Sequence, residues 1–193
     1  MSDKPSYLGL LNAISLAETR AYQYLSAWIE TTNDPDVQCV LRKVAAREGE
    51  HGMAFAKRID ELGFELRDKD DPDFAKRMAI ASSDRSDLKK FEKLGLGRVE
   101  GDVLTIFDNV FADHTIDIRT GELLGRYIAE EFDTARLLRS CHEALRARAS
   151  DAENGVAVEQ RIAALDTKVD ALCRAVDELR QIVCAQTMPA KSG

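Results

Sequence analysis

Residues 47–55 read REGEHGMAF and place a glutamate, Glu48, and a histidine, His51, where a buried helix would carry apolar residues. Over residues 34–62 the apolar residues recur every three or four positions, which predicts one amphipathic helix. Glu48 and His51 occupy two middle positions of its apolar face. Because a buried carboxylate is costly unless it is paired or bound to a metal, these side chains need a partner.

A second helix with an acid in its apolar face is predicted just before this one. In residues 6–31 the apolar residues have the same spacing, and Glu18 fills the one gap in their stripe. The two helices are joined by the short turn TTNDP, so they should pack antiparallel. Glu18 and Glu48 are equally far along the chain from this turn. They should therefore lie at the same height.

Three ligating side chains at one level of a helical pair predict a metal site. His51 follows Glu48 by three residues, so both side chains leave the same helix face. Two carboxylates and an imidazole suit iron or manganese. The alternative is a buried polar network, in which His51 bridges Glu18 and Glu48 without a metal.

The rest of the chain predicts an all-α protein. Residues 64–86 are polar and indicate a long connection with one short helix around 73–81. A third helix is expected over 103–110. A fourth covers 118–149, and its apolar stripe contains Glu131.

A heptad repeat follows these helices. The sequence SDAENG predicts a linker at 150–155, which separates a domain over 1–149 from a coiled-coil helix over 156–188 and a disordered tail over 189–193. The apolar residues of the repeat alternate in steps of four and three: Val158, Ile162, Leu165, Val169, Leu172, Val176, Leu179 and Val183. Such a seam needs a partner helix, so we expect a homodimer or higher homo-oligomer through 156–188.

The acidic residues of the first two helices resemble the ferritin-like superfamily, and rubrerythrin-type bundles in particular. The resemblance covers residues 6–149 and depends on a mid-helix Glu18 followed by a Glu-x-x-His motif at Glu48 and His51. It implies an antiparallel four-helix bundle with one long crossover. It also implies one or two iron or manganese ions and an oxidoreductase activity linked to O₂ or peroxide.

The second half departs from the family pattern. Aligning the apolar stripes matches Glu48 with Glu131 and His51 with Thr134; a shift of one residue would select Glu130 instead. The resemblance implies metal ligands at Glu18, Glu48, His51 and Glu131. For the third helix it implies Glu100, with Asp102 as the fallback. One metal position is therefore expected to be intact and the second incomplete. The alternative function is that of a metal-free bundle that acts as a scaffold or interaction module.

Composition restricts the class of partner. The 193 residues carry a net charge of −7, which argues against nucleic acid or an anionic membrane as a partner. No apolar run is long enough to span a membrane, and the amphipathic N-terminal pattern is not that of a signal peptide. The four cysteines form no C-x-x-C pair, which is typical of a cytoplasmic protein without a zinc or disulfide framework.

Overall fold

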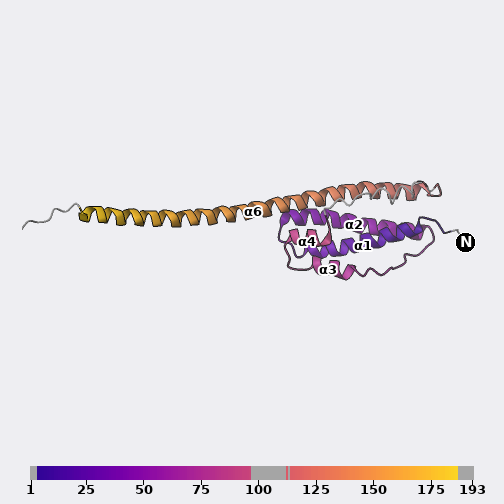
Figure 1. The fold of residues 1–193 in the computed structure, drawn as a ribbon. Coiled ribbons are helices and arrows are strands. Elements are labelled where there is room, and N and C mark those ends of the chain that lie inside the picture. Colours follow the sequence, from indigo (N-terminus) through magenta and orange to yellow (C-terminus); the bar gives the residue numbers. More distant parts are fainter. Residues whose placement is uncertain (1–3, 97–111, 113, 187–193) are drawn as a thin grey trace, which may run out of the picture. The chain divides into compact units, whose positions relative to one another are not determined.

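The computed structural model describes residues 4–96, 112 and 114–186. These residues form helices and no strand, which confirms the all-α prediction. The helices are α1 (Leu8–Ile29), α2 (Pro35–Glu61), α3 (Phe74–Ala81), α4 (Asp87–Leu94) and α6 (Ile118–Gln186) (Figure 1). The helix expected over 103–110 lies outside the described residues. The chain divides into two compact units, Met1–Arg146 and Ala147–Gly193.

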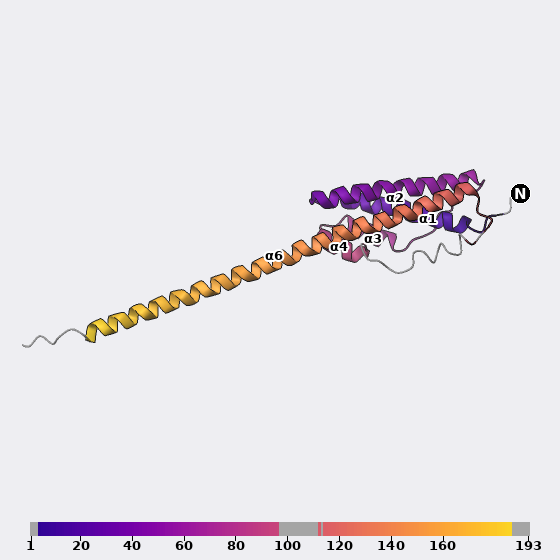
Figure 2. The ribbon, with the colours of Figure 1, turned by 90° about the horizontal axis from the view of Figure 1, so that it is seen from above.

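Helices α1 and α2 form the antiparallel hairpin that the sequence predicts, and they lie side by side in both ribbon views (Figures 1 and 2). The carboxylate of Asp34 starts α2, since it accepts the backbone N–H groups of Asp36 and Val37 at 2.9 and 3.2 Å. The helices approach closely at Gly52, whose carbonyl accepts the Ser15 hydroxyl at 2.8 Å. A side chain at position 52 would meet α1.

Two groups of buried apolar residues lie at opposite ends of the hairpin. One contains Leu11, Phe55 and Leu124, and the other contains Leu41 and Leu138. The first part of α6 therefore contributes to both groups and runs in the same direction as α1. The glutamates and the histidine of the predicted site lie between these two apolar groups.

Helices α3 and α4 pack near the turn that joins α1 to α2. The indole N–H of Trp28 donates to Asp87 at 2.6 Å, and the ring of Phe91 lies 4.9 Å from the Trp28 ring. The short helix expected around 73–81 is confirmed as α3. Helix α4 was not predicted as a separate helix; it ends where Gly95 adopts φ 70°, a left-handed conformation that suits glycine.

The break predicted at 150–155 is wrong, because α6 continues through these residues. The physical reason is that a single Gly155 costs a helix only about 1 kcal/mol relative to alanine, and Asn154 costs less. The division into two units nevertheless falls after Arg146, close to the predicted boundary at 149. None of the described helices combines the length and the apolar composition that crossing a membrane requires.

Candidate metal centre

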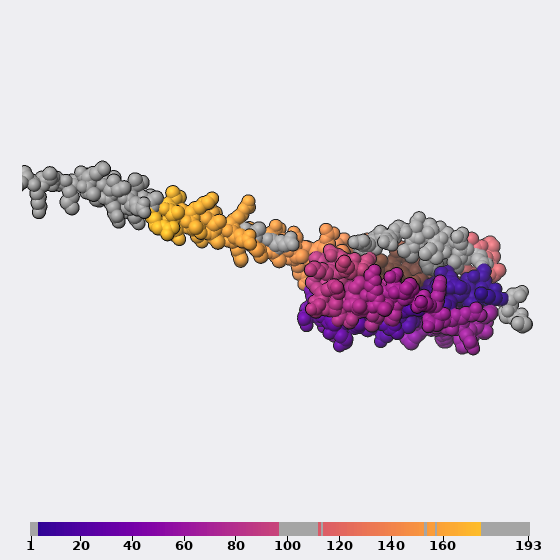
Figure 3. Space-filling model, turned by 60° about the horizontal axis from the view of Figure 1, so that its bottom comes forward, coloured from indigo at the N-terminus to yellow at the C-terminus, as the bar shows by residue number. Residues whose placement is uncertain are grey.

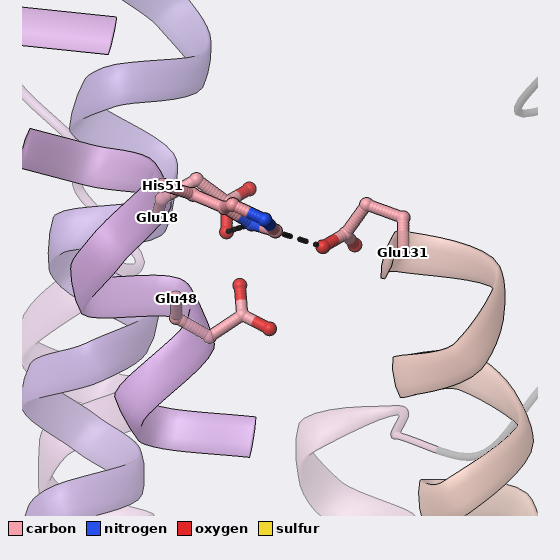
Figure 4. A group of neighbouring side chains, drawn as sticks. All are labelled: Glu18, Glu48, His51 and Glu131. Carbon is pink, nitrogen blue, oxygen red and sulfur yellow. Dashed lines mark ion pairs between the residues drawn. The ribbon is translucent and has the colours of Figure 1, made fainter. Parts of the chain in front are cut away.

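The structure brings together the four residues that the sequence singled out. Glu18 comes from α1, Glu48 and His51 come from α2, and Glu131 comes from α6 (Figure 4). Each offers one ligand atom, and these atoms lie within 4.8 Å of one another. We call these four residues the Glu–His cluster. Glu100, the less favoured fifth ligand, lies outside the described residues.

Glu18, Glu48 and His51 are buried and Glu131 is half-buried, and three buried polar atoms of the cluster face one another without a hydrogen bond. Glu18 Oε2, His51 Nδ1 and Glu131 Oε1 have no hydrogen-bond partner among the described residues. His51 Nδ1 lies 3.5 Å from Glu131 Oε1 and 3.8 Å from Glu18 Oε2. These distances are too long for good hydrogen bonds, and buried polar atoms without partners are costly. A cation between them would satisfy all three.

His51 is oriented by a second glutamate outside the cluster. Its Nε2 lies 2.6 Å from Glu130 Oε2, and Glu130 in turn accepts from Arg126 Nε at 3.0 Å. Since a carboxylate only accepts, we assign a hydrogen to Nε2, which leaves Nδ1 facing Glu18 and Glu131. A histidine that ligates a metal commonly donates its other N–H to a carboxylate in this way.

The two possible alignments of the fourth helix therefore each identify a residue of the site. Glu131 faces His51 Nδ1, as the preferred alignment predicts, and Glu130 contacts Nε2. Sequence reasoning treated the two glutamates as competitors. Because successive helix positions are about 100° apart, both can reach one imidazole when its ring lies edge-on between them.

A tyrosine of α6 completes the surroundings of Glu18. The Tyr127 hydroxyl donates to Glu18 Oε1 at 2.9 Å, and its ring lies edge-on to His51, with centroids 5.0 Å apart. Tyr127 was not among the site residues that the sequence analysis named. Tyr22, one helical turn after Glu18 in α1, is 45 % exposed and packs on Gly49 instead. The position of Tyr127 one turn before Glu131 was the signal that could have identified it.

Arg47 binds the segment where the family resemblance would require a second histidine. Its Nη1 donates to the Thr134 hydroxyl and the Glu130 carbonyl, each at 2.8 Å, and its Nη2 donates to Asp133 at 2.9 Å. Thr134 is therefore engaged by a cationic side chain. His142 stacks on Phe91, well away from the cluster.

The electrostatics of the cluster favour bound cations. Burial, together with the neighbouring carboxyl and negative charge of Glu18, raises the pKa of Glu48 to about 11. Burial alone would raise the pKa of Glu18, but the neighbouring imidazole of His51, the carboxyl of Glu48 and the hydrogen bond from Tyr127 lower it. The charged form is thus favoured on Glu18 and the protonated form on Glu48.

The imidazole also binds a proton strongly. Burial opposes the charge of His51, but Glu131, Glu18 and Glu130 together raise its pKa to about 10. At neutral pH without a metal, protons on His51 and Glu48 therefore compensate the negative charge of the cluster. A metal ion would replace them.

No family model, curated protein or solved structure matches this chain. The ferritin-like resemblance therefore stays a prediction, and the chemistry of the site is inferred from its own residues.

Proposed function

We propose that the Glu–His cluster binds a transition-metal ion, iron or manganese. The observation that carries this proposal is the set of three buried polar atoms, on Glu18, His51 and Glu131, that face one another without a hydrogen bond. The ligand chemistry agrees, because carboxylates with one imidazole and no thiolate suit iron and manganese better than a structural zinc.

A ferritin-like bundle is the architecture we propose for the first unit. Its support is the antiparallel α1–α2 hairpin, the chain's return from the end of α2 to the Trp28 end of the hairpin, and the direction of α6. In such a bundle the bound ion would supply redox chemistry toward O₂ or peroxide. The chain's own residues would contribute the negative charge that stabilises the oxidised ion.

The side chains around the ligands have separate roles in this proposal. Glu130 holds the imidazole of His51 with Nδ1 toward the cluster, and Tyr127 fixes one oxygen of Glu18. The cost of orienting these ligands is then met when the protein folds rather than when the ion binds.

We propose that the cluster takes nearer one ion than two. Thr134 stands where the resemblance would require a second histidine, and the guanidinium of Arg47 binds its hydroxyl. This fixed positive charge beside the cluster opposes a second cation.

Metal retention tests the proposal. Wild-type protein supplied with Mn²⁺ or Fe²⁺ and then desalted should retain about one ion per chain by elemental analysis. Glu48→Gln and His51→Gln should each lose it, whereas Glu122→Gln, at an exposed position of α6, should retain it. Wild-type protein that neither retains nor takes up metal would overturn the proposal and favour the metal-free scaffold.

A further inference from the structure

The second unit carries an apolar seam that is exposed in the single chain. Five described seam residues are between 53 and 66 % exposed: Val158, Ile162, Leu165, Val169 and Leu172. They lie on one continuous helix, α6, and Figure 3 shows the side chains of this part at the surface (orange to yellow). A soluble helix with a row of exposed branched residues normally covers it against a partner.

The spacing of the seam identifies the kind of partner. Its alternating steps of four and three residues average 3.5, the repeat of a left-handed coiled coil, and continue from Val158 to Val183 for nearly four heptads. The buried apolar stripes of α1 and α2 form the core of the first unit. A second chain with the same heptad seam is the partner that this spacing fits.

The residues of the seam favour pairing with the same seam of a second copy. Positions 162, 169, 176 and 183, the a positions, are Ile or Val; positions 165, 172 and 179, the d positions, are Leu. Branched residues at a with Leu at d favour two parallel strands. In that register Arg161, at g, would face Asp166, at e, of the second copy, which is an attractive pair. A reversed pairing would instead set the Ile and Val residues against Leu.

We propose that residues 158–183 pair with the same residues of a second copy of this chain, as a parallel, in-register coiled coil. The seam is then the surface through which the protein dimerises. This proposal is independent of metal binding, since none of its residues belongs to the Glu–His cluster. Each dimer would carry two copies of the first unit.

Two matched variants of the full chain test the seam by light scattering. Wild type should have twice the mass of one chain. Leu172→Asp places a charge in the middle of the seam and should halve the mass, while Ala171→Asp, at the neighbouring exposed position outside the seam, should leave the dimer intact. A helical circular dichroism spectrum of the Leu172→Asp protein would show that it remains folded. A monomeric wild type, or a Leu172→Asp protein that stays dimeric, would overturn the proposal.

Cross-linking tests the register. In a background with Cys39, Cys173 and Cys184 changed to Ser, Ile162→Cys brings the two new thiols together only if the helices are parallel and in register. Oxidation should then produce a covalent dimer that the parent background does not form. The remaining native thiol, Cys141, is buried. A dimer by light scattering that gives no cross-link would refute the parallel register.

Discussion

Metal binding should displace protons from the Glu–His cluster. At pH 7 the carboxyl of Glu48 and the imidazole of His51 are both protonated, because their pKa values are raised to about 11 and about 10. Both must lose a proton to become ligands. The perturbation is therefore the addition of Mn²⁺ to the metal-free protein at a series of pH values.

The two raised pKa values set the size of the effect. Since pH 7 lies well below both, uptake of one ion should release about two protons. The apparent affinity should then rise by up to about 100-fold for each pH unit between about pH 6 and pH 9. The proton count follows from calorimetric titrations in buffers with different ionisation enthalpies, and Glu122→Gln should give the same count as wild type. Binding that releases no protons would refute the assignment of Glu48 and His51 as ligands.

The raised pKa values of His51 and Glu48 also predict how pH affects the stability of the metal-free protein. The pKa of His51 is higher in the fold than its ordinary 6.5, so the stability it contributes is complete below that value and is lost as pH rises toward 10. The pKa of Glu48 is also raised, from 4.5, so above pH 4.5 the folded state binds more protons than the unfolded state. Rising pH therefore destabilises the folded state through Glu48 as well. The midpoint of urea unfolding should therefore fall as pH rises from about 5 to about 9. Saturating Mn²⁺ should remove or reverse this fall, and a metal-free protein that becomes more stable with pH would contradict the reasoning.

Substitutions at three further places, one of them with a matched control, give additional tests. Glu130→Ala frees His51 Nε2 and should weaken Mn²⁺ binding roughly 10- to 100-fold in equilibrium dialysis; unchanged affinity would remove Glu130 from the site. Gly52→Ala places a Cβ 2.5 Å from Thr19 Oγ1 and should lower the free energy of unfolding by about 1–3 kcal/mol. The control Gly125→Ala, in open space, should raise the free energy of unfolding by about 0.5–1 kcal/mol. Equal effects of the two substitutions on urea unfolding would contradict the close helix contact. Asp117→Ala removes the acceptor of the Thr120 backbone N–H in the first turn of α6 and should cost about 0.5–2 kcal/mol in thermal unfolding. Burial would raise the pKa of Asp117, but hydrogen bonds from Thr120, Arg58 and Tyr7 lower it. The stability that Asp117 contributes should therefore be present above pH 3.8 and be lost as pH falls further. A variant with the same acid sensitivity as wild type would refute this.

The hairpin and the Glu–His cluster could be predicted because both depend on spacing along the chain. A short turn forces two adjacent helices to be antiparallel, and residues equally far from the turn, such as Glu18 and Glu48, then lie at one height. Glu131 could be added because its helix repeats the apolar stripe of α2. These are local patterns that require no knowledge of side-chain conformation.

The contacts made by the residues around the Glu–His cluster could not be predicted in this way. Whether Glu130, Tyr127 or Arg47 reaches the cluster depends on the rotation of α6 about its axis and on side-chain rotamers, which the stripe does not specify. Helix α4 was missed because its eight residues make too few turns for a clear period. The predicted break at 150–155 was wrong because one glycine lowers helix stability without ending the helix.

Anomalous diffraction from crystals of the full chain soaked in Mn²⁺ tests the metal centre most directly. We predict one strong manganese peak among Glu18, Glu48, His51 and Glu131, in contact with His51 Nδ1, and no peak there in His51→Gln crystals. A cluster that stays without a peak at saturating Mn²⁺, or a peak only at surface carboxylates, would contradict the proposed metal centre.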